Sequence, residues 1–174
     1  NGSIAIVSTN GDLDVSGITL SAVGGTPPNY GSAFLSAFAG TLTVDLTTIL
    51  LNSDFGNLTL IGGSLVGFGG AAYSLGGTLT VQTGSSVVPA VGEDLDSKNG
   101  DINIRSTAAD VDVSNIFVKA TLGSITLESD AADVIVGSKA FLVSPTIHTL
   151  PTPPWPADPG RITLRAGGTA FVNQ

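Results

Sequence analysis

Gly100 to Val113 reads Gly-Asp-Ile-Asn-Ile-Arg-Ser-Thr-Ala-Ala-Asp-Val-Asp-Val, and 23 residues later Gly123 to Val136 reads Gly-Ser-Ile-Thr-Leu-Glu-Ser-Asp-Ala-Ala-Asp-Val-Ile-Val. Glycine, strand residues and turn residues recur in the same phase in the two stretches. A strand pattern that repeats with a period in this range indicates a solenoid. Core packing alone explains such a repeat, so function has to be argued from shape and surface.

The repeat extends along the chain through a glycine that is followed by apolar residues two and four positions later. This pattern begins at Gly2, Gly11, Gly40, Gly56, Gly77, Gly100, Gly123 and Gly160. Because side chains alternate across a strand, each of these glycines predicts a strand with one apolar and one polar face. The spacings from Gly56 to Gly123 are 21, 23 and 23 residues. They are too short for a strand-helix-strand unit of about 30 residues, and they fit one turn of a three-strand coil.

The sequence therefore predicts an all-β fold, a parallel β-helix (β-solenoid) of roughly seven short turns that forms a single domain over residues 1–174. In the repeat that starts at Gly100 we expect strands at 101–105, 110–114 and 116–120. Parallel strands of successive turns lie about 4.8 Å apart, so equivalent aliphatic side chains should stack into columns. The predicted core columns contain Ile102, Ile104, Val111, Val113, Ile125, Leu127, Val134 and Val136.

Two stretches, near 23–40 and 144–159, interrupt the rhythm and are predicted excursions from the coil. The first contains the loop signal Gly-Gly-Thr-Pro-Pro-Asn. It continues into residues 32–39, where Phe34 and Phe38 fit either a short helix or a strand. The second holds six of the nine prolines. Since proline lacks the N–H group that a strand ladder needs, we expect this segment to leave the coil and return at Gly160.

Composition excludes several classes of function. The net charge is -8, and every Lys and Arg lies beyond residue 97. Nucleic-acid binding is disfavoured, because phosphate contacts need clustered cations. Cysteine is absent, which excludes disulfides, thiol catalysis and Cys-based zinc sites. No apolar run approaches the roughly 20 residues that cross a bilayer, so no membrane span is expected. The first residues resemble neither a signal peptide nor a translation start, and we expect a mature or excised segment.

The runs that begin at Gly2 (Gly-Ser-Ile-Ala-Ile-Val-Ser-Thr-Asn-Gly-Asp-Leu-Asp-Val-Ser) and at Gly123 resemble the degenerate repeats of filamentous-haemagglutinin-type bacterial exoproteins. That resemblance implies a right-handed parallel β-helix that is exported to the cell surface. It also implies roles in adhesion, biofilm formation or cell contact. The likeness covers about two thirds of the chain and leaves out the two excursions.

Asp110 and Asp133 occupy equal positions in consecutive turns, so the predicted stacking brings two carboxylates close together. Like charges in register repel. Ca²⁺, which takes several oxygen ligands, would relieve that repulsion. Hydrogen bonds from local backbone N–H groups in an Asx-turn would relieve it as well. We favour the turn and keep the two aspartates as calcium candidates.

The remaining candidates for a site are weaker. Glu93, Asp94 and Asp96 form the densest acidic cluster, and a pair of carboxylates could serve a glycan-cleaving enzyme. We favour a solvated loop there. His148, the only histidine, has no nucleophile motif near it and is expected in a solvent-exposed loop. Trp155 is the best candidate for recognition by an aromatic side chain, against the alternative that it covers the flank of the coil.

The leading functional hypothesis is a non-enzymatic, extracellular structural or adhesive β-solenoid of a bacterial surface protein. One alternative is a subunit of a self-assembling extracellular filament that stacks end to end, since an uncapped coil exposes strand edges. A second alternative is a glycan-binding or glycan-cleaving β-helix. The expected partners are another copy of the chain or further repeats of the same parent chain, and a cell-surface glycan or protein. No cofactor is expected apart from the calcium candidates.

Overall fold

The computed structural model describes residues 3–22, 31–44, 49–52, 57–66, 71–74, 78–85, 94–97, 100–114, 116–121, 123–137, 141–143 and 162–172. Within these residues the secondary structure is all β, with no helix. Strands that neighbour each other in a sheet pair in parallel, and they come from successive turns of the chain. The predicted fold class, a β-solenoid, is confirmed.

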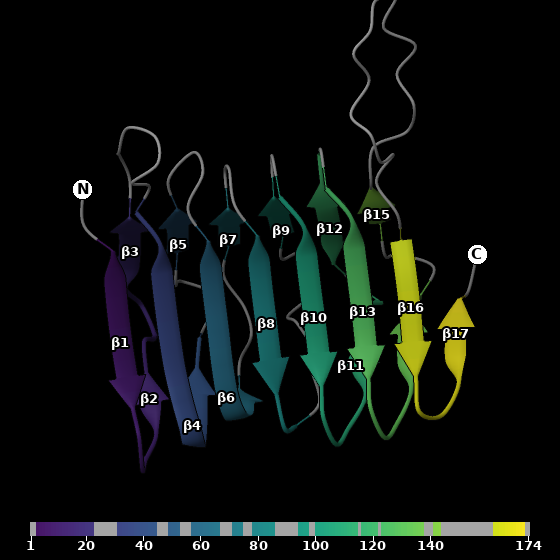
Figure 1. Cartoon of the computed structure of the whole chain (residues 1–174), viewed down its shortest axis with the longest axis horizontal. Helices are drawn as coiled ribbons and strands as arrows, with labels where there is room; N and C mark the ends of the chain where they lie inside the picture. Colours follow the sequence, from purple (N-terminus) through teal and green to yellow (C-terminus); the bar gives the residue numbers. More distant parts are fainter. Residues whose placement is uncertain are drawn as a thin grey trace, which may run out of the picture.

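The largest sheet forms the front of the molecule in Figure 1. Its seven strands stack in the order β1 (Ile4–Ser8), β4 (Ala33–Thr43), β6 (Leu58–Val66), β8 (Leu79–Thr83), β10 (Ile102–Ser106), β13 (Ile125–Ser129) and β16 (Ile162–Ala166). The short strand β2 (Leu13–Asp14) also pairs with β4.

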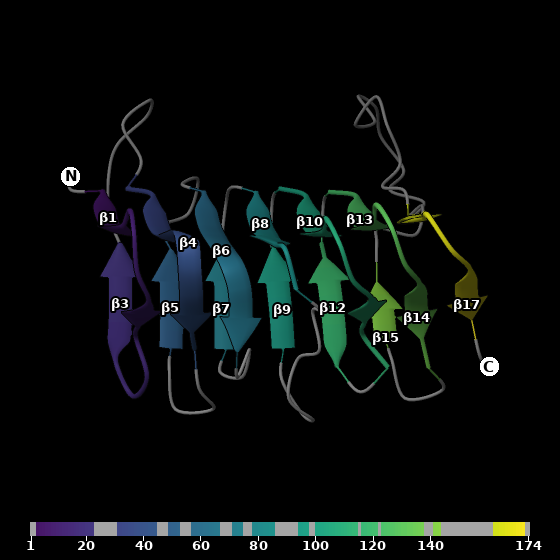
Figure 2. The ribbon, with the colours of Figure 1, turned by 90° about the horizontal axis from the view of Figure 1, so that it is seen from below.

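Two smaller sheets complete the coil, and Figure 2 shows them from below. A six-stranded sheet contains β3 (Thr19–Ala22), β5 (Ile49–Asn52), β7 (Ala71–Ser74), β9 (Asp94–Ser97), β12 (Phe117–Ala120) and β15 (Phe141–Val143). A three-stranded sheet contains β11 (Val111–Asp112), β14 (Val134–Val136) and β17 (Ala170–Val172).

The coil is right-handed. In Figure 1 the strands of the largest sheet run downward at the front, those of the six-stranded sheet run upward behind them, and successive coils advance from left to right. A path that descends at the front, rises at the back and advances to the right describes a right-handed screw. This is the handedness that the resemblance implied.

The number of complete turns differs from the prediction. Among the described residues, a strand of the three-stranded sheet follows only β10, β13 and β16, so a separate third sheet spans only about three turns. The prediction assigned three strands to each of roughly seven turns. Instead, β4 and β6 are 11 and 9 residues long. Both strands continue past the point at which the later coils begin a strand of the three-stranded sheet.

The core is a set of stacked aliphatic columns. Ile102 pairs with Ile125, and Val111 pairs with Val134, as predicted. The other two valines predicted for this side of the coil, Val113 and Val136, also lie in the core. Val113 is fully buried and donates its N–H to Ile135 O, and Val136 is 6% exposed. The first core column runs through all seven strands of the largest sheet: Ile4, Ala33, Leu58, Leu79, Ile102, Ile125 and Ile162. Burial of these columns is the main stabilising contribution to the fold.

The predicted excursion near 23–40 is wrong over its second half. Residues 33–40 belong to β4, in register with β1 and β6. Gly40 therefore lies inside a strand and does not begin one. The register between β4 and β6 shifts between Ala37 and Thr41, and Phe38 in this stretch is 57% exposed. The first half of this excursion and the whole of 144–159 lie outside the described residues.

Two of the repeated glycines are required by close backbone contacts between coils. A Cβ on Gly123 would lie 2.1 Å from Gly100 O, and a Cβ on Gly40 would lie 2.3 Å from Gly11 O. No real Cβ approaches a carbonyl oxygen so closely, so the backbone would have to move. Glycine at these two positions therefore allows consecutive coils to stack.

Candidate functional site

Asp110 and Asp133 lie in consecutive coils, as predicted, but their carboxylates do not face each other as a free pair. Asp110 Oδ1 accepts the backbone N–H of Asp133 at 3.0 Å, and Asp133 Oδ1 accepts the N–H of Thr169 at 2.7 Å. Each carboxylate thus stabilises the backbone of the following coil. The Asx-turn expectation is wrong in detail, because both bonds run between coils and not within one turn.

A similar arrangement of hydrogen bonds between coils lines the corner at which the strands of the largest sheet begin. Ser3 Oγ accepts the N–H of Ser32, Ser32 Oγ accepts that of Asn57, and Asn57 Oδ1 accepts that of Thr78. Asp101 Oδ1 accepts the N–H of Ser124 in the same way at 2.8 Å. These polar side chains form a corner ladder that satisfies backbone donors which the strand pairing leaves free.

Two aspartates do form turns of the Asx type. Asp14 Oδ1 accepts the N–H of Ser16, and Asp112 Oδ1 accepts the N–H of Ser114, each at 2.9 Å. In both turns the serine Oγ donates to the same carboxylate oxygen. The sequence Asp-Val-Ser therefore forms the same turn in the first coil and in the coil of β10.

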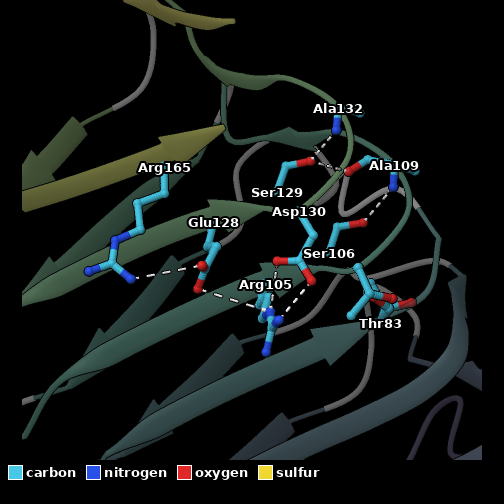
Figure 3. Close-up of polar contacts among 10 residues, drawn as sticks. Thr83, Arg105, Ser106, Ala109, Glu128, Ser129, Asp130, Ala132 and Arg165 are labelled. Carbon is cyan, nitrogen blue, oxygen red and sulfur yellow. Dashed lines mark hydrogen bonds and ion pairs between the residues drawn. The ribbon is translucent and has the colours of Figure 1, made fainter. Parts of the chain in front are cut away.

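Buried hydroxyl groups line the interior of the bend after the largest sheet (Figure 3). Ser129 Oγ donates to Ala109 O at 2.8 Å and accepts the N–H of Ala132 at 3.0 Å. Ser106 repeats the pattern one coil earlier, with Ser85 O as acceptor and the N–H of Ala109 as donor. Both serines are buried and fully used in holding the bend, so neither is placed as a nucleophile.

The outer face of the largest sheet carries an ion network over its last coils, and Figure 3 shows it. Arg105 contacts Asp130 at 2.7 Å and Glu128 at 4.0 Å, and Arg165 contacts Glu128 at 3.9 Å. The hydrogen bond from Arg105 lowers the pKa of Asp130, and the same bond raises the pKa of Arg105. The four charges compensate one another on an exposed surface, where such pairs contribute little to stability.

Sequence reasoning missed this network. A signal for part of it was present, because Arg105 and Glu128 occupy the same position in consecutive repeats and carry opposite charges. Side chains in that relation lie directly opposite each other in neighbouring strands. Asp130 lies two residues beyond, in the turn, and its approach to Arg105 depends on the shape of that turn.

The outer face is apolar over its first coils. Val7 is 47% exposed and Phe38 57% exposed. Val7 and Ile61 flank Ser36 in register on either side. Ser36 is fully buried, and its Oγ has no hydrogen-bond partner among the described residues.

The other predicted site residues give no assembled site. Trp155, His148 and Glu93 lie outside the described residues. Asp94 and Asp96 belong to β9 in the six-stranded sheet, which replaces the predicted solvated loop at these two positions. Within the described ranges, no three His, Asp or Glu side chains gather where they could hold a metal ion. The described part of the chain also has no helix long and apolar enough to cross a bilayer.

Fold and surface together define an all-β, right-handed parallel β-solenoid whose polar side chains mainly serve the coil itself. Comparison with protein-family models, with curated proteins and with solved structures found no match for this chain.

Proposed function

We propose that this chain is a non-enzymatic, extracellular structural module of a bacterial surface protein, a spacer whose stacked coils hold loops at a distance from the cell. The observation that carries the proposal is the stacking in the largest sheet, in which seven strands from successive coils share their core columns. Such quasi-one-dimensional stacking gives an elongated element whose length grows with the number of repeats.

The use of the carboxylates supports a structural role. Asp12, Asp101, Asp110 and Asp133 each accept a backbone N–H from the following coil. Asp14 and Asp112 hold turns, and Asp130 binds Arg105. A general acid or base must be free to exchange a proton with a substrate, whereas these seven groups are engaged with the coil.

The extracellular setting is supported by the resemblance to filamentous-haemagglutinin-type repeats. An acidic surface with a net charge of -8 favours solubility and disfavours nucleic-acid partners. In this proposal, adhesion belongs to the surfaces that the coil displays.

Surface labelling of intact producing cells with an antibody against the chain tests this proposal. We expect labelling without permeabilisation. Labelling that requires permeabilised cells would contradict the extracellular assignment. The purified chain is incubated in parallel with a panel of polysaccharides, and we expect no release of reducing ends. Release that disappears in the Asp94→Asn variant would contradict the non-enzymatic assignment.

A further inference from the structure

The first and the last described strands of the largest sheet each have one open edge. Among the described residues, β1 pairs only with β4, and β16 pairs only with β13. In the intervening coils the inward residue that begins each strand donates its N–H to the next coil. Leu79 donates to Asp101 O at 2.9 Å and Ile102 donates to Ser124 O at 2.8 Å. Ile162 holds the same position, with no described coil beyond it.

The core columns reach the surface at the end formed by β16 and β17. Ile162 is 43% exposed, whereas Ile125, its neighbour in the column, is fully buried. Val172 is 59% exposed, whereas Val136 beside it is 6% exposed. Exposed apolar surface at the end of an otherwise dry column is a surface that a further coil would bury.

The first coil has the shape that such a further coil needs. Strands β1 and β16 are both five residues long, and both begin two residues after a glycine. Leu13 follows Ile4 by nine residues, as Val111 follows Ile102 and Val134 follows Ile125. The Asx-turn at Asp14 is the same as the turn at Asp112. The first coil therefore repeats the geometry of the coils near the other end.

Charge favours the joining of unlike ends. Residues 1–97 contain no Lys or Arg, and the first coil carries Asp12 and Asp14. The last coil presents Arg165, whose side chain is 67% exposed. Two first coils placed face to face would bring acidic groups together, whereas a first coil on a last coil avoids that repulsion. It also continues the parallel pairing that every other coil contact uses.

We propose that a second copy of this chain stacks head to tail on the first, with β1 of one copy added to β16 of the other in the register Ile4 to Ile162. This inference deepens the proposed structural role and rests on it. A contact of this kind joins two different surfaces, so it repeats without closing and produces a filament. The register places Val7 of one copy directly opposite Arg165 of the other.

A charge swap at this junction tests the register. Val7 is 47% exposed on the outer face, so a charged side chain there does not enter the core. Opposite charges directly across parallel strands attract and like charges repel. Sedimentation velocity over a wide concentration range should show concentration-dependent association of the wild-type chain. Val7→Arg should weaken it about two- to fivefold and Val7→Glu should strengthen it by a similar factor.

Two further variants complete this test. The double variant Val7→Arg with Arg165→Glu should regain wild-type association, because the junction pair is again of opposite charge. Phe38→Arg is the matched control, since it places the same charge on the same face in an inner strand, and it should leave association unchanged. A wild-type chain that stays monomeric, as it would if only further repeats of a parent chain occupy these ends, overturns the proposal. Equal association of the Val7→Arg and Val7→Glu variants overturns the register.

Blocking one end at a time tests the polarity. Ala5→Pro removes an N–H on the open edge of β1, and Ile162→Asp with Val172→Asp places charges on the exposed columns. Thermal unfolding confirms that each variant is folded. Each variant alone should be monomeric, and an equal mixture should form a dimer that grows no further. Dimers of either variant alone would show joining of like ends and overturn the proposal. Surface labelling reports separately on the proposed function, since it does not depend on association of the purified chain.

Discussion

Arg105 binds Asp130 of the following coil through two parallel hydrogen bonds, with Nε 3.0 Å from Oδ1 and Nη2 2.7 Å from Oδ2. This contact ties the turn after β13 to the outer face of β10. A guanidinium and a carboxylate in this two-point geometry form one of the stronger polar contacts that a surface offers.

The pKa of Asp130 predicts an acid-dependent loss of stability. Because the hydrogen bond from Arg105 holds this pKa below its ordinary value of 3.8, the pair stabilises the folded state above that value, and the contribution disappears as the pH falls through the lowered pKa. Asp130→Asn should therefore lower the unfolding temperature near neutral pH by a small amount, because the pair lies on an exposed surface. It should have little effect at a pH well below 3.8. A difference between the two chains that is the same at both pH values would contradict this assignment.

Ile125→Asp should destabilise the fold by about 3 kcal/mol or more, because it buries an unpaired charge in the middle of a core column. Ile125 is fully buried, and Ile162 in the same column is 43% exposed. Ile162→Asp is therefore the matched control and should cost much less. Chemical denaturation measures the free energy of unfolding of both variants. Equal effects of the two substitutions would show that the column is not dry at Ile125.

Gly123→Ala should cost about 1–3 kcal/mol, because the added Cβ would meet Gly100 O at 2.1 Å and force the coils apart. Gly11→Ala is the control, since the nearest atom to its added Cβ is Ser8 Oγ at 3.7 Å. We expect Gly11→Ala to have little effect on the free energy of unfolding. A Gly123→Ala variant as stable as the wild type would contradict the close contact between the backbones at Gly100 and Gly123.

Asp133→Ala should weaken the last coil by about 1 kcal/mol, because the N–H of Thr169 loses its acceptor. Asp133→Asn retains an oxygen acceptor and should be close to the wild type. Amide hydrogen exchange at Thr169 measures the local effect and should be faster only in the alanine variant. Equal exchange rates in all three chains would show that the Asp133 side chain does not protect the N–H of Thr169.

Calcium should leave the unfolding temperature unchanged, because Oδ1 of each aspartate already accepts a backbone N–H, that of Asp133 at Asp110 and that of Thr169 at Asp133. The comparison is between excess Ca²⁺ and excess chelator. A rise in the unfolding temperature with Ca²⁺, lost in Asp110→Asn, would establish the calcium site that the stacked aspartates suggested.

The repeat made the late coils predictable from sequence. Ile102 on Ile125 follows from equal phase in two copies of one pattern, and the expected strands at 101–105 and 116–120 agree with β10 and β12 to within one residue. Local alternation and a fixed period contain this information, because stacking places equivalent positions on one another.

The early coils were less predictable, because their signals were ambiguous. Phe34 and Phe38 are spaced to fit one face of a helix or of a strand, and only the contacts with β1 and β6 select the strand. Gly40 has the same local sequence pattern as the glycines that precede strands, yet it lies within β4. The bonds that the aspartates make between coils were missed for a related reason, since the N–H that Asp133 accepts belongs to Thr169, 36 residues away.

The register of the stacked columns is tested most directly by nuclear Overhauser effects between isoleucine methyl groups in methyl-labelled protein. Neighbouring coils lie about 4.8 Å apart and alternate coils about 10 Å apart. We expect strong cross-peaks from Ile125 to Ile102 and to Ile162, and none between Ile102 and Ile162. Absence of the Ile125 to Ile102 cross-peak in the folded protein would contradict the coiled fold and every inference drawn from it.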